Sequence, residues 1–193
     1  MNCTFEYASP IGKLTIASDG ENVTGLWMRD QKYYGQSVEG DLEKRSVPVF
    51  KRVREWLDRY FRGEAPDVDF PLAPGGSAFR LIILDILRTI PYGETMTYAE
   101  VARQAAAKMD RKSMSSQAVG GAVGHNPISI IIPCHRVVGS NGSLTGFSGG
   151  LDKKIHLLRL EKVDMSQFFD PTANADAHSG SLFEPLRPDA AGA

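Results

Sequence analysis

Alternating apolar and polar positions open the chain and predict a small β-sheet. Residues 3–8, 12–18 and 23–29 each read as a short strand, with turn-forming residues between them. Helical periodicity then predicts a helix over 47–62, with an apolar stripe that suits packing against the sheet. That stripe comprises Phe50, Val53, Trp56, Leu57, Tyr60 and Phe61.

A segment rich in Pro, Gly and Ala at 63–76 reads as a linker, and helical patterning returns after it. The predicted helices cover residues 77–89, 98–108, 116–124 and 150–162. Thr97 and Glu100 form a capping box that opens the second of these. The helices over 98–108 and 116–124 are joined by a polar stretch, which makes them a helix-turn-helix candidate.

These elements predict a mixed α/β (α+β) protein in three parts. Residues 1–75 form a small sheet-plus-helix domain with its linker, and residues 76–163 form a helical domain. Residues 164–193 read as an acidic tail, mostly disordered or loosely attached. The second part carries eleven Lys/Arg against six Asp/Glu, although the whole chain has a formal net charge of −1. A basic segment in a nearly neutral chain suits contact with phosphate.

Composition excludes several other classes of protein. No apolar run approaches the length of a membrane span, and the N-terminus lacks a basic-then-apolar signal pattern. The two cysteines, Cys3 and Cys134, are too few for a disulfide framework. We therefore expect a reducing cytoplasm. No CxxC motif or His/Cys cluster is present, so no metal site is expected.

The strongest candidate for chemistry is Cys134. The apolar run 130–132 reads as a buried strand that ends at Pro133 and then presents Cys134, followed directly by His135 and Arg136. A lone cysteine at a strand end is most often an inert core residue. A thiol needs nearby His or Arg to become a thiolate at neutral pH, and these neighbours favour a reactive cysteine.

The predicted helix over 116–124 is almost bare of side chains. Its small residues are Ala118, Gly120, Gly121, Ala122 and Gly124. Each glycine costs a helix about 1 kcal/mol relative to alanine, so several of them call for a reason. Two explanations stay open: close approach of something large to the helix, or tight packing of one helix on another.

Several motifs resemble the O6-alkylguanine-DNA alkyltransferases, also called methylated-DNA–protein-cysteine methyltransferases. The resemblance covers roughly residues 78–163, while the N-terminal match is weaker and rests on Ser9-Pro10-Ile11-Gly12. The matching motifs are Pro91-Tyr92-Gly93-Glu94-Thr95, Ala118-Val119-Gly120-Gly121-Ala122, Asn126-Pro127, Pro133-Cys134-His135-Arg136, Gly146-Phe147-Ser148-Gly149-Gly150-Leu151 and Leu157-Leu158-Arg159-Leu160-Glu161. The resemblance implies a ribonuclease-like N-terminal domain and a winged-helix-like C-terminal domain.

The resemblance also implies a catalytic set. Cys134 would be the nucleophile and the alkyl acceptor, and His135 would be its base, acting through a bridging water. Glu161 would orient His135 and stabilise its charge, following the logic of a nucleophile–base–orienter triad. Asn126 would join this hydrogen-bond network, and Tyr98 would give a proton to the leaving guanine. From local sequence alone, Glu161 and Asn126 are equally well read as a helix-end carboxylate and a turn residue.

Four further residues would bind the substrate. The carbonyl of Val137 would accept a hydrogen bond from the guanine amino group, as would that of Cys134. Phe147 would wall the alkyl pocket, Ser148 would bond near the guanine oxygen, and Lys154 would face the same site.

In the family, the helix over 116–124 lies in the minor groove of DNA, which is only about 6 Å wide and suits small side chains. The implied DNA-contacting residues are Gln117, Ala118, Gly120, Gly121 and Arg136. The family places an arginine at the start of this helix to fill the space left by the flipped nucleotide. Because this chain has Gln117 there, we expect weaker duplex affinity or an altered preference, but retained chemistry.

The expected function is direct reversal of O6-alkylguanine damage, with O4-alkylthymine as a minor substrate. The expected partner is double-stranded DNA containing O6-alkylguanine, and no cofactor, membrane or obligate protein partner is expected for what would be a monomer. The alternatives are a non-catalytic lesion-binding protein, a cysteine hydrolase or redox protein, and a helix-turn-helix regulator. The absence of a second nearby cysteine argues against redox chemistry, and the bare helix argues against reading of base edges.

Overall fold

The N-terminal half is built around a small antiparallel sheet with one added parallel strand. The computed structural model describes residues 2–36, 38 and 40–172. Its sheet contains β1 (Asn2–Ser9), β2 (Gly12–Ser18), β3 (Val23–Met28) and β4 (Leu42–Lys44), in the order β3-β2-β1-β4. β2 pairs antiparallel with both β1 and β3, and β4 lies parallel to β1. The three predicted strands are confirmed, whereas β4 was missed because it is short and exposed throughout.

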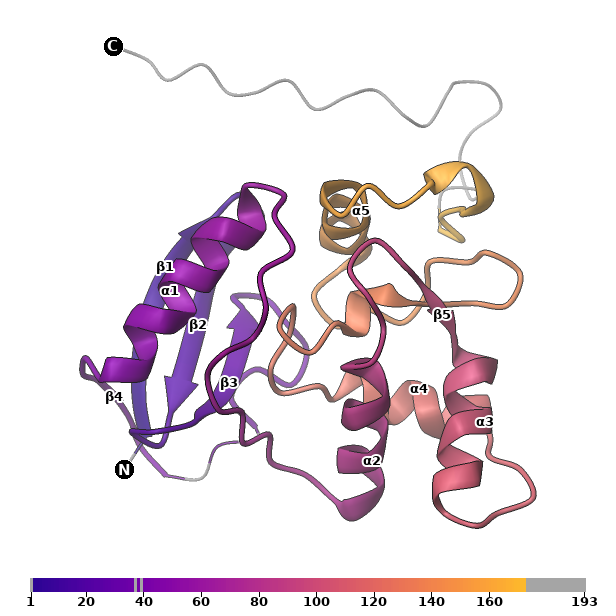
Figure 1. The fold of residues 1–193 in the computed structure, drawn as a ribbon, viewed down its shortest axis with the longest axis horizontal. Coiled ribbons are helices and arrows are strands. Elements are labelled where there is room, and N and C mark those ends of the chain that lie inside the picture. Colours follow the sequence, from indigo (N-terminus) through magenta and orange to yellow (C-terminus); the bar gives the residue numbers. More distant parts are fainter. Residues whose placement is uncertain (1, 37, 39, 173–193) are drawn as a thin grey trace.

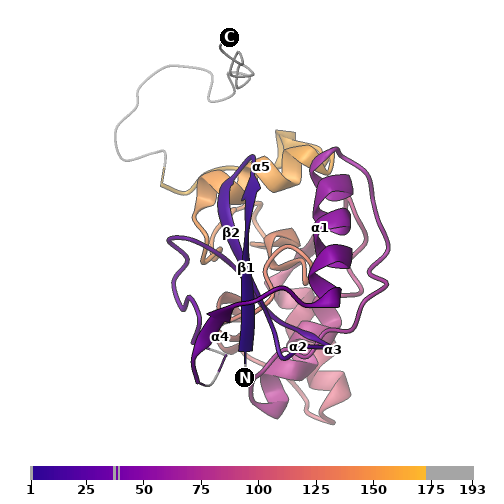
Figure 2. The ribbon, with the colours of Figure 1, turned by 90° about the vertical axis from the view of Figure 1, so that its left-hand side faces the viewer.

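Helix α1 (Pro48–Phe61) covers one face of this sheet (Figures 1 and 2). Its apolar stripe is buried as the periodicity predicted, and Phe50 packs on Phe5 of β1 with ring centroids 4.7 Å apart. Pro48 begins the helix at a position where a missing N–H costs nothing.

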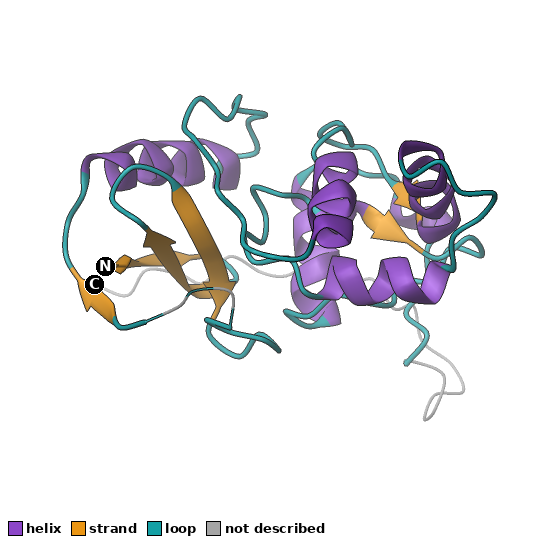
Figure 3. Cartoon of the chain, turned by 90° about the horizontal axis from the view of Figure 1, so that it is seen from below, coloured by secondary structure: helices purple, strands orange, loops and turns teal. Residues whose placement is uncertain are grey.

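The C-terminal half is a cluster of helices around a two-stranded parallel sheet, as Figure 3 shows. Its elements are α2 (Ala78–Leu87), β5 (Met96–Thr97), α3 (Tyr98–Lys108), α4 (Ser116–Gly124), η1 (Cys134–Arg136), β6 (Val137–Val138) and α5 (Leu151–Leu160). All four predicted helices are present, and both hydrogen bonds of the capping box between Thr97 and Glu100 are formed. The predicted fold class, a sheet-plus-helix part followed by a helical part, is confirmed.

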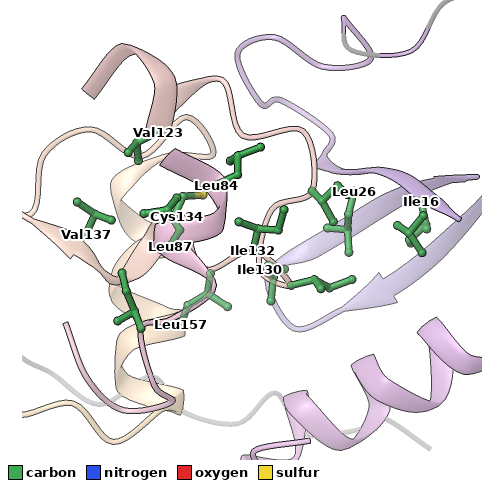
Figure 4. Packing of buried hydrophobic residues seen from close by; sticks show 14 of the residues in the cluster. Ile16, Leu26, Leu84, Leu87, Val123, Ile130, Ile132, Cys134, Val137 and Leu157 are labelled. Atoms are coloured by element: carbon green, nitrogen blue, oxygen red, sulfur yellow. The ribbon is translucent and has the colours of Figure 1, made fainter. Parts of the chain in front are cut away.

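The edge of β3 joins the two halves. Leu26 donates its N–H to the Pro127 carbonyl at 2.9 Å and accepts from the Ser129 N–H at 3.0 Å. The predicted linker also pairs here, because Ala73 donates to the Val23 carbonyl at 2.8 Å. One hydrophobic core spans the junction, and Figure 4 shows Ile130 and Ile132 between the sheet and the helices. The nucleophile candidate therefore lies beside a rigid interface.

The segment 130–132 is buried but is not a strand, which corrects the sequence prediction. Ile130 has a φ of 72°, and the backbone turns so that Ile132 donates to the Ile128 carbonyl at 3.0 Å. An uninterrupted apolar run shows only that a segment is buried on all sides, and periodicity cannot distinguish a turn from a strand over so few residues.

The chain remains packed beyond the predicted start of the tail at 164. A single turn, η2 (Met165–Gln167), follows α5, and Phe168 is buried in a small cluster with Leu144 and Leu158. Residues 165–168 of the predicted tail are therefore packed rather than loosely attached. The rest of the predicted tail, from 173 onward, lies outside the described residues. Within the described part of the chain, no helix is both long and apolar enough to span a membrane.

Candidate active site

Cys134 opens the η1 turn directly after Pro133 and is only 2% exposed. Asn126 Nδ2 donates to the Cys134 Sγ at 3.1 Å and to the Ile132 carbonyl at 2.7 Å. Asn126 Oδ1 in turn accepts from the Ile128 N–H at 3.0 Å. Asn126 therefore fixes the turn that carries the thiol and aims an N–H dipole at the sulfur, as predicted.

The surroundings of the thiol act on its pKa in opposite directions. Burial is the largest effect and raises the pKa of Cys134, while the Asn126 hydrogen bond and the positive charge of Lys154 lower it. Burial prevails, so the group rests as a thiol at neutral pH. Reaction at this sulfur therefore needs a base that removes the proton as the new bond forms.

His135 is placed to be that base. The imidazole is fully buried, and its Nε2 lies 2.7 Å from Glu161 Oε1, so the predicted contact between these residues is formed. Burial lowers the pKa of His135, and the hydrogen bond that the ring donates to Glu161 opposes this effect but does not outweigh it, which leaves a neutral ring. Because Nε2 donates to the carboxylate, Nδ1 carries the lone pair. No group of the described residues donates a hydrogen bond to this buried Nδ1.

Glu161, the C-cap residue of α5, accepts hydrogen bonds from several groups of the site. Arg136 donates to it through Nε at 2.7 Å and Nη2 at 3.0 Å, and the Gly93 N–H adds a third contact at 3.2 Å. Burial raises the pKa of Glu161, but the hydrogen bonds from His135 and Arg136 and the positive charge of Arg136 outweigh it and hold the pKa well below its usual range. The carboxylate is therefore ionised and fixed opposite His135.

Arg136 faces inward, which corrects its assignment to the DNA-contacting set. Besides its two bonds to Glu161, its Nη1 donates to the Ile90 carbonyl at 2.6 Å, and its side chain is 11% exposed. All three of its nitrogens are thus engaged within the protein. This inward orientation could not be predicted from the sequence, because an arginine beside a reactive cysteine is equally consistent with phosphate binding.

Tyr60 of α1 also reaches Glu161 and was missed from the sequence. Its hydroxyl donates to Glu161 Oε1 at 2.6 Å and lies 3.4 Å from His135 Nε2. A tyrosine on an apolar helical stripe is read as packing, and only the pairing of the two halves reveals its polar end.

Lys154 lies on α5 with its ammonium group inside the protein. Nζ donates to the Val137 carbonyl at 2.6 Å and to the Thr145 carbonyl at 2.9 Å, and the residue is fully buried. Burial lowers the pKa of Lys154 to about 8, against a smaller opposing effect from Cys134. Lys154 thus ties β6 to the 145–148 loop, and the Val137 carbonyl already has one partner.

We expect Lys154→Met to lower the free energy of unfolding by about 1–3 kcal/mol, because a buried carbonyl loses its donor. Lys153→Met is the matched control, since Lys153 donates to the Gly149 carbonyl at 3.0 Å from a partly exposed position. Urea unfolding of both variants checks this. Equal decreases in the free energy of unfolding would show that the buried hydrogen bonds of Lys154 stabilise the protein no more than the partly exposed bond of Lys153.

The loop that carries Phe147 and Ser148 packs against Tyr98. The Tyr98 hydroxyl donates to the Thr145 carbonyl at 3.2 Å, and burial raises its pKa, with the Cys134 charge as a second cause. Gly146 has a φ of 85°, and a Cβ there would collide with the Tyr98 hydroxyl, so the close approach requires glycine. Tyr98 therefore remains a protonated donor beside the loop.

Of the predicted DNA-contacting residues of α4, Gly121 is exposed, whereas Gly120 is half-buried and lies against Tyr98. Gln117 and Ala118 are exposed, whereas Val119 of the same helix is buried in the core. A Cβ added at Gly121 or Gly124 would meet nothing within 4 Å. Packing within the described residues therefore does not explain Gly121 or Gly124.

Fold and site together define a protein whose nucleophile is a buried cysteine served by a histidine–carboxylate pair, next to a helix with a bare outer face. Two family models match the chain. The "6-O-methylguanine DNA methyltransferase, ribonuclease-like domain" matches residues 4–74, and the "6-O-methylguanine DNA methyltransferase, DNA binding domain" matches residues 78–163.

Relatives and solved structures agree with these matches. The chain is 45% identical over 158 residues to a methylated-DNA–protein-cysteine methyltransferase of Haemophilus influenzae, which covers 81% of this chain and 84% of the relative. A relative of that name from Mycolicibacterium paratuberculosis is 44% identical over 80% of this chain and 88% of its own length. The crystal structure of Mycobacterium tuberculosis OGT in complex with DNA is 40% identical with a TM-score of 0.70, covering 86% of this chain and 94% of that one. The chain belongs to the methylated-DNA–protein-cysteine methyltransferase family.

Proposed function

We propose that this protein repairs DNA by moving a methyl or larger alkyl group from O6 of guanine onto Cys134, directly and irreversibly. The observation that carries the proposal is the buried Cys134 beside His135, whose Nε2 is held by Glu161 and whose Nδ1 is available to accept a proton. The activity in the names of the curated relatives supports the same reading.

The reaction needs one proton acceptor and one proton donor. His135 Nδ1 takes the Cys134 proton through a bridging water, and the sulfur attacks the alkyl carbon. The new S–C bond forms as the C–O6 bond breaks, and the electron pair of that bond passes to the guanine. Because a thioether is not hydrolysed in water, each molecule reacts once.

Tyr98 supports the departure of the guanine. Its raised pKa keeps the hydroxyl protonated, and it can give that proton to a ring nitrogen as charge develops there. Ser148 binds near the guanine oxygen, Phe147 walls the alkyl group, and the free lone pair of the Val137 carbonyl accepts from the guanine amino group.

Because Cys134 is buried, the damaged base must leave the DNA duplex to reach it. Turning a nucleotide out of the stack costs a few kcal/mol. The face of α4 with few side chains suits a narrow minor groove. Gln117, at the start of α4, would lie beside the space that the flipped nucleotide leaves in the base stack.

The direct test is the mass of the intact protein after incubation with duplex DNA containing one O6-methylguanine, followed by peptide mapping. We expect a gain of one methyl group on Cys134 that never exceeds one per molecule. Bound lesion DNA without any gain in mass would instead indicate a lesion-binding protein, and repeated turnover would indicate a hydrolase.

Gln117→Arg is expected to tighten binding to duplex DNA by about three- to tenfold at low salt and to steepen the salt dependence by roughly one phosphate contact. Ser46→Arg, which adds the same charge just before α1, is the control for net charge. Fluorescence anisotropy over a salt series checks both variants. An equal gain with Ser46→Arg would show that position 117 has no particular contact with DNA.

We also propose that the protein acts as a monomer in a reducing cytoplasm, with O4-alkylthymine as a minor substrate. Both cysteines are free thiols in the structure, and the proposed chemistry consumes a reduced Cys134.

A further inference from the structure

Tyr60 is a residue of the N-terminal half that contacts the centre of the site. It lies on α1, is 1% exposed, and donates its hydroxyl to the same Glu161 oxygen that holds His135. The two heavy-atom distances to that oxygen are 2.6 Å from Tyr60 and 2.7 Å from His135. Arg136 Nη2 is a third donor to this oxygen at 3.0 Å, so three donors share one carboxylate oxygen.

Packing explains the ring of Tyr60 but not the place of its hydroxyl. The ring stacks on Trp56 with centroids 5.1 Å apart and meets Tyr92 edge-on at 6.1 Å. A buried hydroxyl needs an acceptor, and any backbone carbonyl would serve. Here the acceptor is the ionised carboxylate that also bonds to the imidazole of His135. The hydrogen bond from Tyr60 therefore changes the negative charge that acts on His135.

We propose that Tyr60 is a positioning residue that limits the basicity of His135 by sharing the charge of Glu161. The inference rests on the proposed function, in which His135 accepts the Cys134 proton. A hydrogen bond to an ionised group draws on its negative charge, so the same oxygen stabilises an imidazolium less strongly. Tyr60 thus keeps His135 neutral and ready to accept a proton.

Several other charged and titratable groups surround His135 and act on its pKa. Glu161 favours the protonated ring, whereas Arg136 and Lys154 oppose it, and burial lowers the pKa of the ring most of all. Cys134 precedes it in the η1 turn, and Tyr92 approaches Arg136 with its ring centroid 5.8 Å from the guanidinium. Tyr60 is neutral and bonds directly to the Glu161 carboxylate. Removing its hydroxyl therefore changes the electrostatic field at His135 without changing the net charge.

Tyr60→Phe is expected to raise the pKa of His135 and move the acidic limb of the pH–rate profile for alkyl transfer upward by about 0.5–1 pH unit, the size of one net hydrogen bond. Below the limb, the single-turnover rate falls about three- to tenfold, since a protonated His135 cannot act as the base. Above the limb, the rate stays close to that of the unsubstituted protein.

Tyr92→Phe is the matched control. Tyr92 donates its hydroxyl to the Leu160 carbonyl at 3.1 Å, one residue before Glu161, and does not bond to the carboxylate. This variant also loses one tyrosine hydrogen bond, so it is expected to lower the melting temperature without moving the limb. A merely structural role for Tyr60 would give the same result in both variants.

The midpoint is measured from single-turnover transfer between about pH 5 and 9, a window that brackets the ordinary pKa of histidine. The His135 ring is titrated in parallel by NMR, with His135→Asn to assign its signals. An unchanged midpoint and ring pKa in Tyr60→Phe, or equal shifts in Tyr92→Phe, would overturn the proposal. If the unsubstituted protein shows no transfer, the proposed function fails, and the NMR titration alone decides the effect of Tyr60 on His135.

Discussion

Cys134→Ala is expected to abolish alkyl transfer while binding to duplex DNA is retained. The sulfur is the only atom of this residue that can form the thioether, and Asn126 Nδ2 donates a hydrogen bond to it at 3.1 Å. Gln117 and Ala118 of α4, which we assign to DNA, are exposed, and the substitution removes one small buried atom elsewhere. Transfer is measured by intact mass, and binding by anisotropy with lesion-containing duplex.

Cys3→Ala provides the control, because the chain has only these two cysteines and Cys3 is buried in β1. This variant is expected to gain one methyl group per molecule, like the unsubstituted protein. Transfer that persisted in Cys134→Ala, or that was lost in Cys3→Ala, would contradict the assignment of the acceptor.

Glu161→Gln is expected to slow transfer by about 10²-fold or more, which is the range of general-base catalysis. The amide cannot stabilise a protonated His135, and it leaves the guanidinium of Arg136 without its counter-charge in a buried place. Removing one partner of a buried ion pair destabilises a protein by about 3–5 kcal/mol, so the variant should also unfold at lower urea concentration.

The stability effect should depend on pH in a definite direction. The folded pKa of Glu161 lies below its ordinary value of 4.5, so its contribution is fully present above that pH and is lost as the pH falls through the folded pKa. The difference between the unsubstituted protein and Glu161→Gln should therefore shrink in acid. Urea unfolding between about pH 3 and 7 measures it, since this range spans the ordinary pKa of glutamate.

Glu64→Gln is the matched control for the loss of an arginine-paired carboxylate. Glu64 accepts from Arg59 at 2.7 Å and from Arg62 at 2.9 Å, but at an exposed position. Exposed ion pairs contribute about 0–1 kcal/mol, so this variant should lose little stability and no transfer. Equal losses in the two variants would mean that burial of the Glu161 pair has no consequence.

Much of the architecture follows from local pattern. The strands β1 to β3, the helices α1 to α5 and the capping box of Thr97 and Glu100 were predicted, because period and cap chemistry depend on neighbours in the sequence. The strand predicted over 130–132 was wrong because burial on every side removes the alternation that would identify a strand. The short β4 was missed because it is polar and exposed and has no buried face to mark it.

The candidate site divides in the same way. The candidate nucleophile, its neighbouring base and the bare helix could be predicted from the sequence, since each is recognisable within a few residues of chain. Tertiary structure alone decided which groups meet at Glu161: Tyr60 enters from the N-terminal half, Arg136 turns inward, and Gly93 closes the site from the loop after α2. A carboxylate can accept from any donor that folding brings to it, and those donors lie far apart in the sequence, so no local pattern specifies them.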